Sequence, residues 1–509
     1  MRKIALVPLD ERPCNYLFAP ALARMADVEV VRPPLNIMGQ KKQRGDVPQI
    51  HQWLMDIASE VDGFILSFDT LLYSGIVPSR LHNESVDSLQ PYLKTVKKIK
   101  ASFPDKPLFG FSLIMRNPTY SNSDEEPDYY QDFGREIHRK GFIEHKQKLK
   151  IASEAERNEL ISIQERLPLE YYEDYCQRRD VNLKMNQEII KLVADNIIDF
   201  LIIPQDDASP YGLTAVDQDV VRKTIIRFEV GMRVLMYPGA DEVANTLLSR
   251  MILQEQSMPL NVLVRYTSEG ASQLIPLYED RPLHETLKYQ IIAAGGRMVT
   301  SMAEADVLLV VNAPPSNMLN ASMAHLRSIE YNAFRNLPEA VLQMKHVLEQ
   351  TVKSVVLADV AYGNGSDLEM INLLKQEDLL FKLHGYAGWN TSSNTLGTAI
   401  PMGFLRHRFG PSKHHLDFLG WRYAEDGGYC AIVRQEVTAK LQDMKLNYFE
   451  VDGSEGVVSN MVRDRIQNFL DQHINDLNHQ VKINRCWMPW NRMFEVGLEV
   501  RVEHQNNPL

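Results

Sequence analysis

Two adjacent aspartates, Asp206 and Asp207, follow an apolar run in the stretch DFLIIPQDDASPYG (199–212). In a partly dry cavity, mutual repulsion and loss of water raise the pKa of one such carboxyl. That group then keeps its proton near neutrality and can act as a general acid, while its neighbour stays ionised. Neighbouring strand residues point to opposite faces, so both side chains can share a cavity only in a loop, which Pro204 and Pro210 favour. We therefore predict that Asp207 is the acid and Asp206 its partner; the alternative is an Asx-type turn that caps the next helix.

Other apolar runs are also followed by polar side chains. Asp241 and Glu242, in PGADE, are candidates for a base or nucleophile if the mechanism uses two separate carboxylates. Single carboxylates at such positions are usually helix caps, but caps do not explain arginine, amide and aromatic side chains at the same positions. We predict that the substrate-binding residues are Asp10, Glu11, Arg12, Asp69, Arg80, Arg116, Asn117, Tyr211, Asn312, Asp359, Tyr362, Asn364, Tyr386, Trp389, Asn390 and Asn394.

The segment HGYAGWNTSSNTLG (384–397) combines a tryptophan with a series of amide and hydroxyl side chains. A sugar needs an aromatic ring to stack on its C–H faces and planar amides to bond neighbouring hydroxyls. The segment therefore favours a carbohydrate ligand for Trp389, Asn390 and Asn394. The alternative is a core tryptophan followed by a Ser/Thr/Asn helix cap.

Two other classes of function remain open. A metal-dependent hydrolase of amide or ester bonds would take its ligands from Asp10, Asp69, Asp206, Asp359 and His384. A non-catalytic protein that binds a small polar ligand would not need so many carboxylates. HExxH, GxSxG, P-loop and dinucleotide-binding motifs are absent from the sequence, so we expect no metal and no cofactor.

The elements that must position these residues are short, continuously apolar runs. Such runs indicate strands buried on both faces, hence a parallel sheet with crossover helices. The runs are 3–9, 28–34, 63–69, 107–115, 199–204, 232–238, 261–267, 306–312, 354–359 and 381–387. We predict an α/β fold with a (β/α) barrel-like parallel sheet, and the alternative is two doubly wound α/β domains.

The pattern along the chain also predicts its organisation. Residues 1–255 form an N-terminal α/β part, which contains a charged helical insertion over 125–198. Residues 256–440 form a second α/β half. The pattern weakens in residues 441–509, which we expect to be a C-terminal appendage with a strand pair.

The composition excludes several partners. The net charge of -11 is spread along the chain without a basic tract, which argues against nucleic acid. The four cysteines show no CxxC spacing, which fits a reducing compartment. The N-terminal apolar run is too short for a signal peptide, and no apolar run reaches about 18 residues. We therefore predict a cytoplasmic protein that does not enter a membrane. The sequence leaves homo-oligomer formation open.

Six segments together resemble an uncharacterised bacterial family, domain of unknown function 4127. They are VPLDERP, SGIVPSR, QDDASPYG, PGADE, ADVAYGNGSD and YAGWNTSSNTLG. The resemblance covers nearly the whole chain. It implies a bacterial protein of one family throughout, and it assigns no activity.

A second resemblance concerns mechanism. An aspartate doublet after a strand, with a Trp–Asn segment on a late strand, is similar to the barrel hexosaminidases of the substrate-assisted kind. In those enzymes one acid orients the acetamido group of the substrate and its neighbour protonates the leaving oxygen. The resemblance implies the orienting role for Asp206 and the acid role for Asp207. We therefore expect a glycoside hydrolase that acts on a small-molecule or oligosaccharide substrate.

Overall fold

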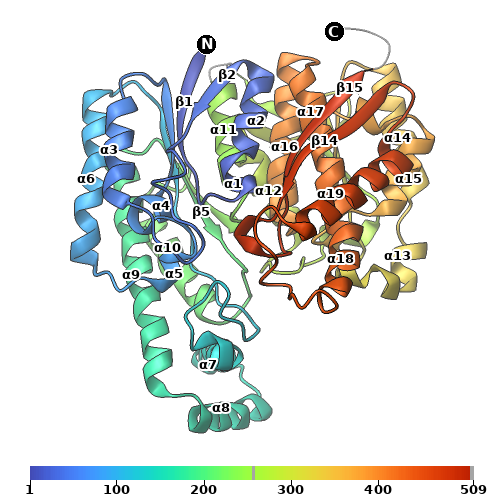
Figure 1. Ribbon diagram of the computed structural model, residues 1–509. Helices are drawn as coiled ribbons and strands as arrows, with labels where there is room; N and C mark the ends of the chain where they lie inside the picture. The colour runs from blue at the N-terminus through green and yellow to red at the C-terminus, as the bar shows by residue number, and fades with distance from the viewer. Residues whose placement is uncertain (255–257, 505–509) are drawn as a thin grey trace. The chain divides into compact units, whose positions relative to one another are not determined.

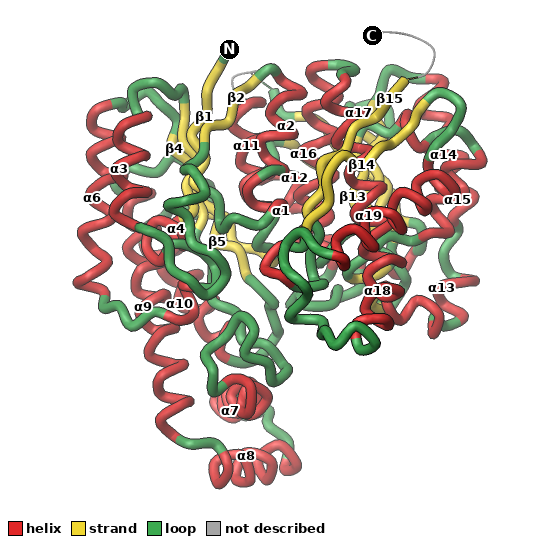
Figure 2. Tube along the Cα trace, in the orientation of Figure 1, coloured by secondary structure: helices red, strands yellow, loops and turns green. Residues whose placement is uncertain are grey.

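The computed structural model of the chain describes residues 1–254 and 258–504. Parallel strands form two large sheets, one of six strands and one of five (Figure 1, Figure 2). Helices alternate with the strands along both halves of the chain. The predicted α/β class, with parallel sheets and crossover helices, is therefore confirmed.

The order of the strands defines the kind of sheet. In the first sheet it is β2–β1–β3–β4–β5–β6, and in the second it is β13–β11–β9–β7–β8. In each sheet the first strand of the chain, β1 or β7, lies between the second and the third. This order is that of a doubly wound sheet, in which ligands bind at the carboxyl ends of the strands where the winding reverses. The strand orders therefore favour the doubly wound alternative over the barrel-like sheet.

The first sheet consists of β1 (Arg2–Val7), β2 (Val28–Val31), β3 (Gly63–Ser67), β4 (Leu108–Phe111), β5 (Phe200–Gln205) and β6 (Val234–Pro238). Every residue of β3, β4, β5 and β6 is buried, as the continuous apolar runs predict. One hydrophobic cluster contains residues of these strands together with residues of helices α3 (Val47–Ile57), α6 (Val86–Ser102) and α9 (Leu169–Ala194). These helices therefore hold the sheet in place.

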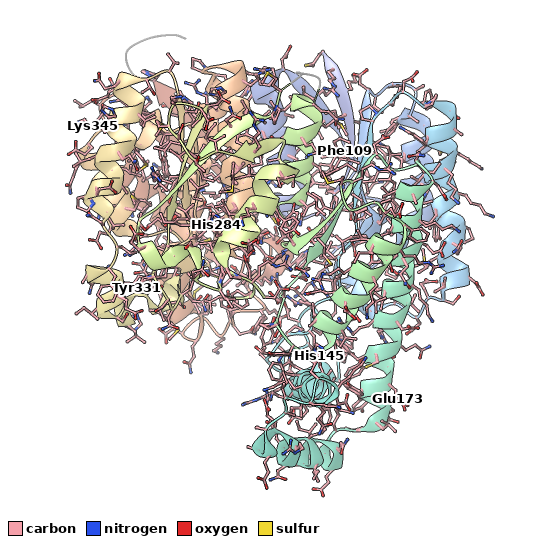
Figure 3. All side chains as sticks on the ribbon, turned by 180° about the vertical axis from the view of Figure 1, so that it is seen from behind. Phe109, His145, Glu173, His284, Tyr331 and Lys345 are labelled. Atoms are coloured by element: carbon pink, nitrogen blue, oxygen red, sulfur yellow. The ribbon has the colours of Figure 1, made fainter. Side chains whose placement is uncertain are left out.

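The segment between β4 and β5, where the sequence predicts a helical insertion, is mainly helical. It consists of α7 (Tyr130–Lys148), α8 (Glu154–Arg166) and α9, and it extends beyond the carboxyl ends of the strands (Figure 1). His145 on α7 and Glu173 on α9 mark it in Figure 3, where Phe109 marks β4. A separate hydrophobic cluster that includes Tyr130 and Tyr175 stabilises the insertion.

The second sheet consists of β7 (Leu260–Tyr266), β8 (Gly296–Met298), β9 (Val307–Asn312), β11 (Ser354–Asp359) and β13 (Gly385–Ala387). Helix α16 (Ser392–Phe409) contacts β11 and β13, and α14 (Leu337–Gln350) contacts β9 and β11. Strand β8 has no counterpart among the predicted runs, because it is only three residues long and has one buried residue.

The C-terminal region contains α19 (Val457–Phe469) and an antiparallel pair, β14 (His479–Trp487) with β15 (Gly497–His504). The sequence predicts a strand pair in this region. Helix α17 (Lys413–Arg422) contacts β15, which connects the pair to the rest of its unit.

Internal contacts divide the chain into two compact units. The first unit contains Met1–Glu11, Val30–Val243 and Tyr278–Asp280, and the second contains Arg12–Glu29, Ala244–Leu277 and Arg281–Leu509. The predicted parts 1–255, 256–440 and 441–509 follow the chain, whereas each compact unit collects separate segments of it. Of the helices in the described residues, none has both the length and the apolar composition needed to cross a bilayer.

Candidate active site

The aspartate doublet lies at the carboxyl end of β5 in the first unit. Strand β5 ends at Gln205, so Asp206 and Asp207 belong to the turn that follows. Asp207 has a φ of 43°, in the left-handed region that aspartate tolerates better than most residues. The Asp206 side chain is 14% exposed and the Asp207 side chain 23% exposed. Both carboxyls are therefore partly buried but within reach of a ligand.

Each aspartate has its own arginine. Arg80, in helix α5 (Pro78–Leu81), donates from Nη2 to Asp206 Oδ2 at 2.8 Å. Arg116 donates from Nη1 to Asp207 Oδ2 over a longer 3.4 Å. The ion pair of Asp206 is the closer of the two, so the two neighbouring carboxyls have different surroundings.

Two glutamates join these arginines. Glu125 Oε2 accepts from Arg80 Nη1 at 2.9 Å and from Arg116 Nη2 at 3.1 Å. Glu126 Oε1 accepts from Arg80 Nη1 at 3.3 Å and from Arg116 Nε at 2.7 Å. Each glutamate oxygen therefore bridges both guanidinium groups and fixes their separation.

The backbone around Arg116 is held by the sheet and by α9. Ile114 N donates to Pro204 O at 2.9 Å, which brings the chain after β4 alongside the end of β5. The Arg116 carbonyl accepts from Tyr175 Oη at 2.7 Å and from Arg179 Nη1 at 2.9 Å. The helical insertion thus positions the arginine that contacts Asp207.

A third aspartate, Asp69, lies in α4 (Phe68–Tyr73), immediately after β3. Asp69 is not the cap of α4, because Ser67 caps it by accepting from Thr70 N. Asp69 Oδ2 instead accepts from Leu113 N at 3.0 Å. Burial is the main cause that raises the pKa of Asp69 to about 7, and the Arg80 charge opposes that rise.

The pKa of Asp207 is also raised to about 7. Burial is the largest cause, and the charge of Asp206 adds to it, whereas the Arg116 and Arg80 guanidinium groups oppose it. A carboxyl with this pKa is substantially protonated at neutral pH, as a general acid must be. The direction of the shift is the one that the sequence predicts for one member of the doublet.

The cluster as a whole is acidic. We define the acidic cluster as Asp69, Arg80, Arg116, Glu125, Glu126, Asp206 and Asp207, which contains five carboxyl groups and two guanidinium groups. Both arginines are engaged by carboxylates of the protein. The cluster therefore repels anions and favours a neutral or cationic group next to Asp207.

The other candidates in the first unit have partners outside this cluster. Asp10 is buried after β1, and Glu11 Oε1 accepts from Lys41 N at 3.0 Å. Asn117 donates from Nδ2 to Tyr130 Oη at 3.1 Å. Tyr211 packs edge-on against Phe142 of α7, with ring centroids 5.6 Å apart.

The two alternative catalytic candidates, Asp241 and Glu242, follow β6 and are both buried. Glu242 Oε2 accepts from Ala240 N at 2.8 Å, so this carboxylate closes the turn before α11 (Val243–Leu253). That contact gives Glu242 a structural role, and the acidic cluster gives Asp206 and Asp207 the better placement for chemistry.

The second unit has a buried polar network at the same place in its sheet. Asn312, which ends β9, donates from Nδ2 to Asp359 Oδ1 at 3.0 Å and to Asp367 Oδ2 at 3.2 Å. Arg335 Nη1 pairs with Asp367 Oδ2 at 2.5 Å, and Tyr386 Oη donates to Asp359 Oδ2 at 3.5 Å. Burial, followed by the charge of Asp367, raises the pKa of Asp359 to about 7. Asp359 and Asn312 are both fully buried, so this network holds the loops of the second sheet together.

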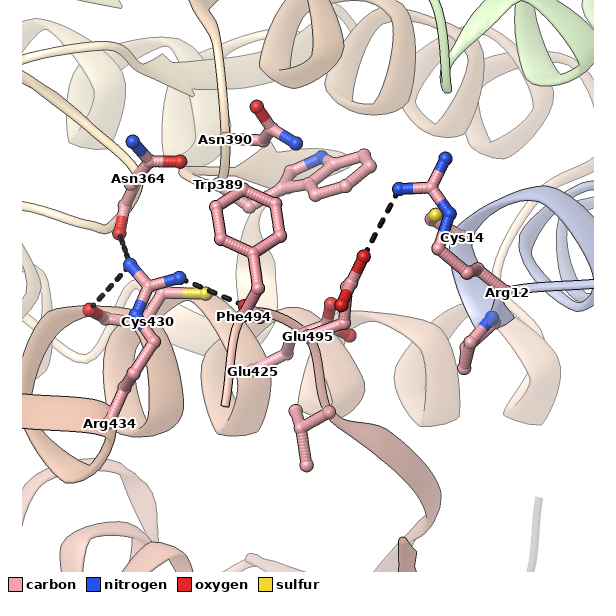
Figure 4. Close-up of a pocket in the computed structure, with 12 residues that line it drawn as sticks. Arg12, Cys14, Asn364, Trp389, Asn390, Glu425, Cys430, Arg434, Phe494 and Glu495 are labelled. Atoms are coloured by element: carbon pink, nitrogen blue, oxygen red, sulfur yellow. Dashed lines mark hydrogen bonds and ion pairs between the residues drawn. The ribbon is translucent and has the colours of Figure 1, made fainter. Parts of the chain in front are cut away.

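Four other candidates of the second unit line a small cavity (Figure 4). They are Arg12, Asn364, Trp389 and Asn390. Arg12 Nη1 pairs with Glu495 Oε1 at 3.2 Å, and Asn364 N donates to Asn390 O at 2.7 Å. The cavity measures about 20 Å³, which is room for about one water molecule. Its present size does not accommodate a sugar ring.

Trp389 is 6% exposed, and its Nε1 donates to Thr398 Oγ1 at 3.2 Å. Its ring lies edge-on to Phe18, with centroids 5.5 Å apart. Thr391 caps α16 by accepting from Asn394 N. These contacts are those of a core tryptophan followed by a helix cap. The expected pocket shared by Trp389 and Asp207 joins residues of two different units and stays a prediction.

The remaining candidates have local partners. The Tyr362 ring stacks on Tyr331, with centroids 4.9 Å apart, and Asn394 O accepts from Thr398 Oγ1 at 2.8 Å. His384 Nδ1 accepts from Val355 N at 3.3 Å, and burial lowers the pKa of its imidazole to about 4. Within residues 1–254 and 258–504, no group of three His, Cys, Asp or Glu side chains is arranged to hold a metal ion.

Sequence reasoning missed Glu125 and Glu126. The signal was present, because EEP at 125–127 repeats the pattern of adjacent carboxylates near a proline that drew attention to QDDASP. It was overlooked because the residues lie in a charged stretch that was assigned to the helical insertion. In the second unit, Arg335 was missed because an isolated arginine carries no spacing signal.

Fold and site together define an α/β protein made of two doubly wound units, with an acidic cluster at the carboxyl edge of the first sheet. The chain belongs to the family described as a protein of unknown function, DUF4127, which residues 4–499 match. No curated protein matches the sequence.

Proposed function

We propose that this protein is a carbohydrate-active hydrolase, specifically a glycoside hydrolase whose acid is Asp207 and whose orienting carboxylate is Asp206. The observation that supports this is the unequal pair: Asp206 is held by Arg80 at 2.8 Å, whereas Asp207 contacts Arg116 at 3.4 Å and has a pKa raised to about 7, mainly by burial. Glycosidic bond cleavage requires a protonated carboxyl as the acid, and the raised pKa of Asp207 suits it to that role.

In the proposed reaction, the Asp207 carboxyl gives its proton to the glycosidic oxygen as the bond from that oxygen to the anomeric carbon breaks. The positive charge that develops on the sugar ring is stabilised by the Asp206 carboxylate and by the acidic character of the cluster. Water finally supplies the hydroxyl at the anomeric carbon and returns a proton to Asp207, so the atoms balance.

The role of Asp206 follows from its rigidity. Arg80 is 2% exposed and is bound to Glu125, Glu126 and Asp206, so the Asp206 carboxylate has little freedom to turn. A fixed carboxylate can orient the group that attacks the anomeric carbon. By the resemblance to substrate-assisted hexosaminidases, we propose the acetamido oxygen of an N-acetylated amino sugar as this group.

Replacing Asp207 with Asn tests the assignment. General acid catalysis contributes about 10²- to 10⁴-fold, so turnover of alkyl glycosides should fall by that factor. A 2,4-dinitrophenyl glycoside has a leaving group that needs no proton, so its turnover should fall much less. The measurement is kcat/KM for both substrates over a panel of sugars that includes N-acetylated amino sugars.

Asp219→Asn is the matched control. Asp219 is an exposed carboxylate of helix α10 (Leu213–Arg227) in the same unit and pairs with Lys223. This variant should hydrolyse both substrates like the wild type. Equal turnover of the alkyl glycoside by Asp207→Asn and by the wild type would refute the acid role.

We further propose that the protein works in the cytoplasm on a small-molecule or oligosaccharide substrate. The support for the compartment is that all four cysteines, Cys14, Cys176, Cys430 and Cys486, are free thiols. Free thiols suit a reducing environment.

A further inference from the structure

A cavity of the first unit lies between the loop after β4 and helix α7. It is lined by Thr119, Tyr120, Ser121, Arg135, His138 and Arg139 and measures about 610 Å³. The cavity is open to solvent rather than enclosed, so a substituted sugar fits against it with much of its surface still exposed. Figure 2 shows loop segments between β5 and α7, where this part of the chain runs.

The walls of the cavity are held in place. Arg135, His138 and Arg139 are spaced i, i+3 and i+4 on α7, so they share one face of the helix. The loop is fixed to that face by two hydrogen bonds: Arg135 N donates to Ser121 Oγ at 3.1 Å, and His138 Nδ1 donates to Asn117 O at 2.9 Å. The cavity is therefore a built feature of the insertion.

The polar groups of the cavity are mainly donors. Thr119, Tyr120 and Ser121 supply three hydroxyl groups, and Arg135 and Arg139 supply guanidinium groups. Arg139 forms a two-point ion pair with Glu159, at 2.9 and 2.7 Å. In the described part of the chain no carboxylate lies within ion-pair distance of the exposed Arg135. The guanidinium group of Arg135 and the hydroxyls of Thr119 and Ser121 are thus available to an anionic ligand, whereas the Tyr120 hydroxyl faces the acidic cluster.

Tyr120 connects the cavity to the acidic cluster. Its phenol interacts electrostatically with both Arg116 and Asp207, while its ring lines the cavity. The acidic cluster repels anions, so an anionic substituent of a sugar bound next to Asp207 has to lie elsewhere. The hydrogen-bond donors of the cavity, on the other side of Tyr120, can bind this anionic substituent.

We propose that this cavity binds an oxyanion substituent of the substrate, a phosphate, sulfate or carboxylate on the saccharide. The inference rests on the proposed glycosidase function and adds the class of substrate to it. A ring that carries such a group would place the oxyanion among Arg135, Ser121 and Thr119, and its glycosidic oxygen at Asp207.

The test is anion binding by the full-length protein, measured by titration calorimetry with inorganic sulfate, inorganic phosphate and acetate at constant ionic strength. Comparing the three ions distinguishes the tetrahedral anions from a carboxylate. The wild type should bind at least one of them saturably, and Arg135→Ala should weaken that binding at least tenfold, because it removes a charge-assisted hydrogen bond. Lys223→Ala, which removes an exposed cation of α10 in the same unit, should bind the ion like the wild type.

Lack of saturable binding by the wild type, or equal binding by Arg135→Ala and the wild type, would overturn the inference. A second measurement uses an aryl glycoside with and without a sulfate ester: Arg135→Ala should raise KM at least tenfold for the sulfated substrate only. The ion titration needs no turnover. It therefore decides the anion site even if Asp207→Asn shows that the glycosidase assignment is wrong.

Discussion

At the scale of single residues, two chemically identical side chains acquire different roles from their contacts. Asp206 and Asp207 are neighbours in the chain, but Asp206 has the close arginine and Asp207 has the long contact. Burial and the Asp206 charge both raise the pKa of Asp207. Burial, and after it the charge of Asp206, therefore favours the protonated form of Asp207.

The effect of the Asp206 charge on the pKa of Asp207 predicts that Asp206→Asn changes the pH dependence. A general acid works only when protonated, so kcat/KM of the wild type should fall as pH rises through about 7, the pKa of Asp207. Asparagine removes the charge that raises this pKa, so the fall should move to lower pH, by roughly one unit. The pH profile of kcat/KM for an aryl glycoside measures the shift.

Asp219→Asn serves again as the control, because it removes an exposed carboxylate of the same unit. Its pH profile should coincide with that of the wild type. If the falling limb of Asp206→Asn stayed in place or moved to higher pH, the electrostatic coupling between the two aspartates would be disproved.

At the scale of elements, α7 joins the helical insertion to the loop after β4. Gly134 lies where the loop meets the helix: a Cβ added there would lie 2.7 Å from the Tyr120 carbonyl oxygen and 2.3 Å from Tyr130 Cδ1. Only a residue without a side chain permits this approach. The position of Tyr120, and with it the boundary between cavity and acidic cluster, depends on that contact.

Gly134→Ala should therefore displace the loop. Overpacking of this kind costs about 1–3 kcal/mol, which exceeds the gain of about 1 kcal/mol from the better helix propensity of alanine. We expect a lower urea midpoint and lower glycosidase activity, since the same loop leads to Glu125 and Glu126. Both quantities are measured on the full chain.

The matched control is Gly231→Ala in the same unit. A Cβ at Gly231 would have one neighbour, at 3.9 Å, so the substitution fits without movement. It should leave stability and activity almost unchanged. A Gly134→Ala variant as stable and as active as Gly231→Ala would show that the loop tolerates displacement.

At the scale of the whole molecule, both units bury acids whose pKa values lie far above the ordinary range. Burial is the main cause for Asp69, Asp207 and Asp359, each raised to about 7, and for Asp426, raised to about 8. In the unfolded chain these groups release their protons near pH 4. Above that pH the folded protein holds protons that the unfolded chain has lost.

Stability should consequently fall as pH rises from 6.5 to about 8.5, because the folded state binds more protons than the unfolded state in this window. Burial lowers the pKa of the His82 and His384 imidazoles to about 4. These histidines therefore reduce stability only when the pH falls below about 6.5, the ordinary pKa of histidine. Urea unfolding at pH 6.5, 7.5 and 8.5 measures the trend. Asp69→Asn should flatten it, and a midpoint that rose steadily to pH 8.5 would contradict it.

The hydrophobic pattern determined the strands. Continuous apolar runs are forced by burial on both faces, and the run at 199–204 became β5 for this reason. The sequence did not predict strand β8, because three residues of mixed burial form no continuous apolar run. The charge of residues 125–198 predicted a helical insertion. The order of the strands depends on packing between segments that are distant in the sequence. The sequence therefore left the barrel and the doubly wound sheets as alternatives.

The sequence by itself determined that Asp206 and Asp207 would leave a strand end together, because a proline on each side and the end of the apolar run require a loop there. Only the tertiary structure decided which charges would surround them. Arg80 reaches Asp206 across 126 positions of the chain, because α5 folds onto the end of β5. Glu125 and Glu126, in the loop after β4, are brought in by their bonds to Arg80. Proton affinity depends on burial and on charges within a few ångströms, and neither is written in local spacing.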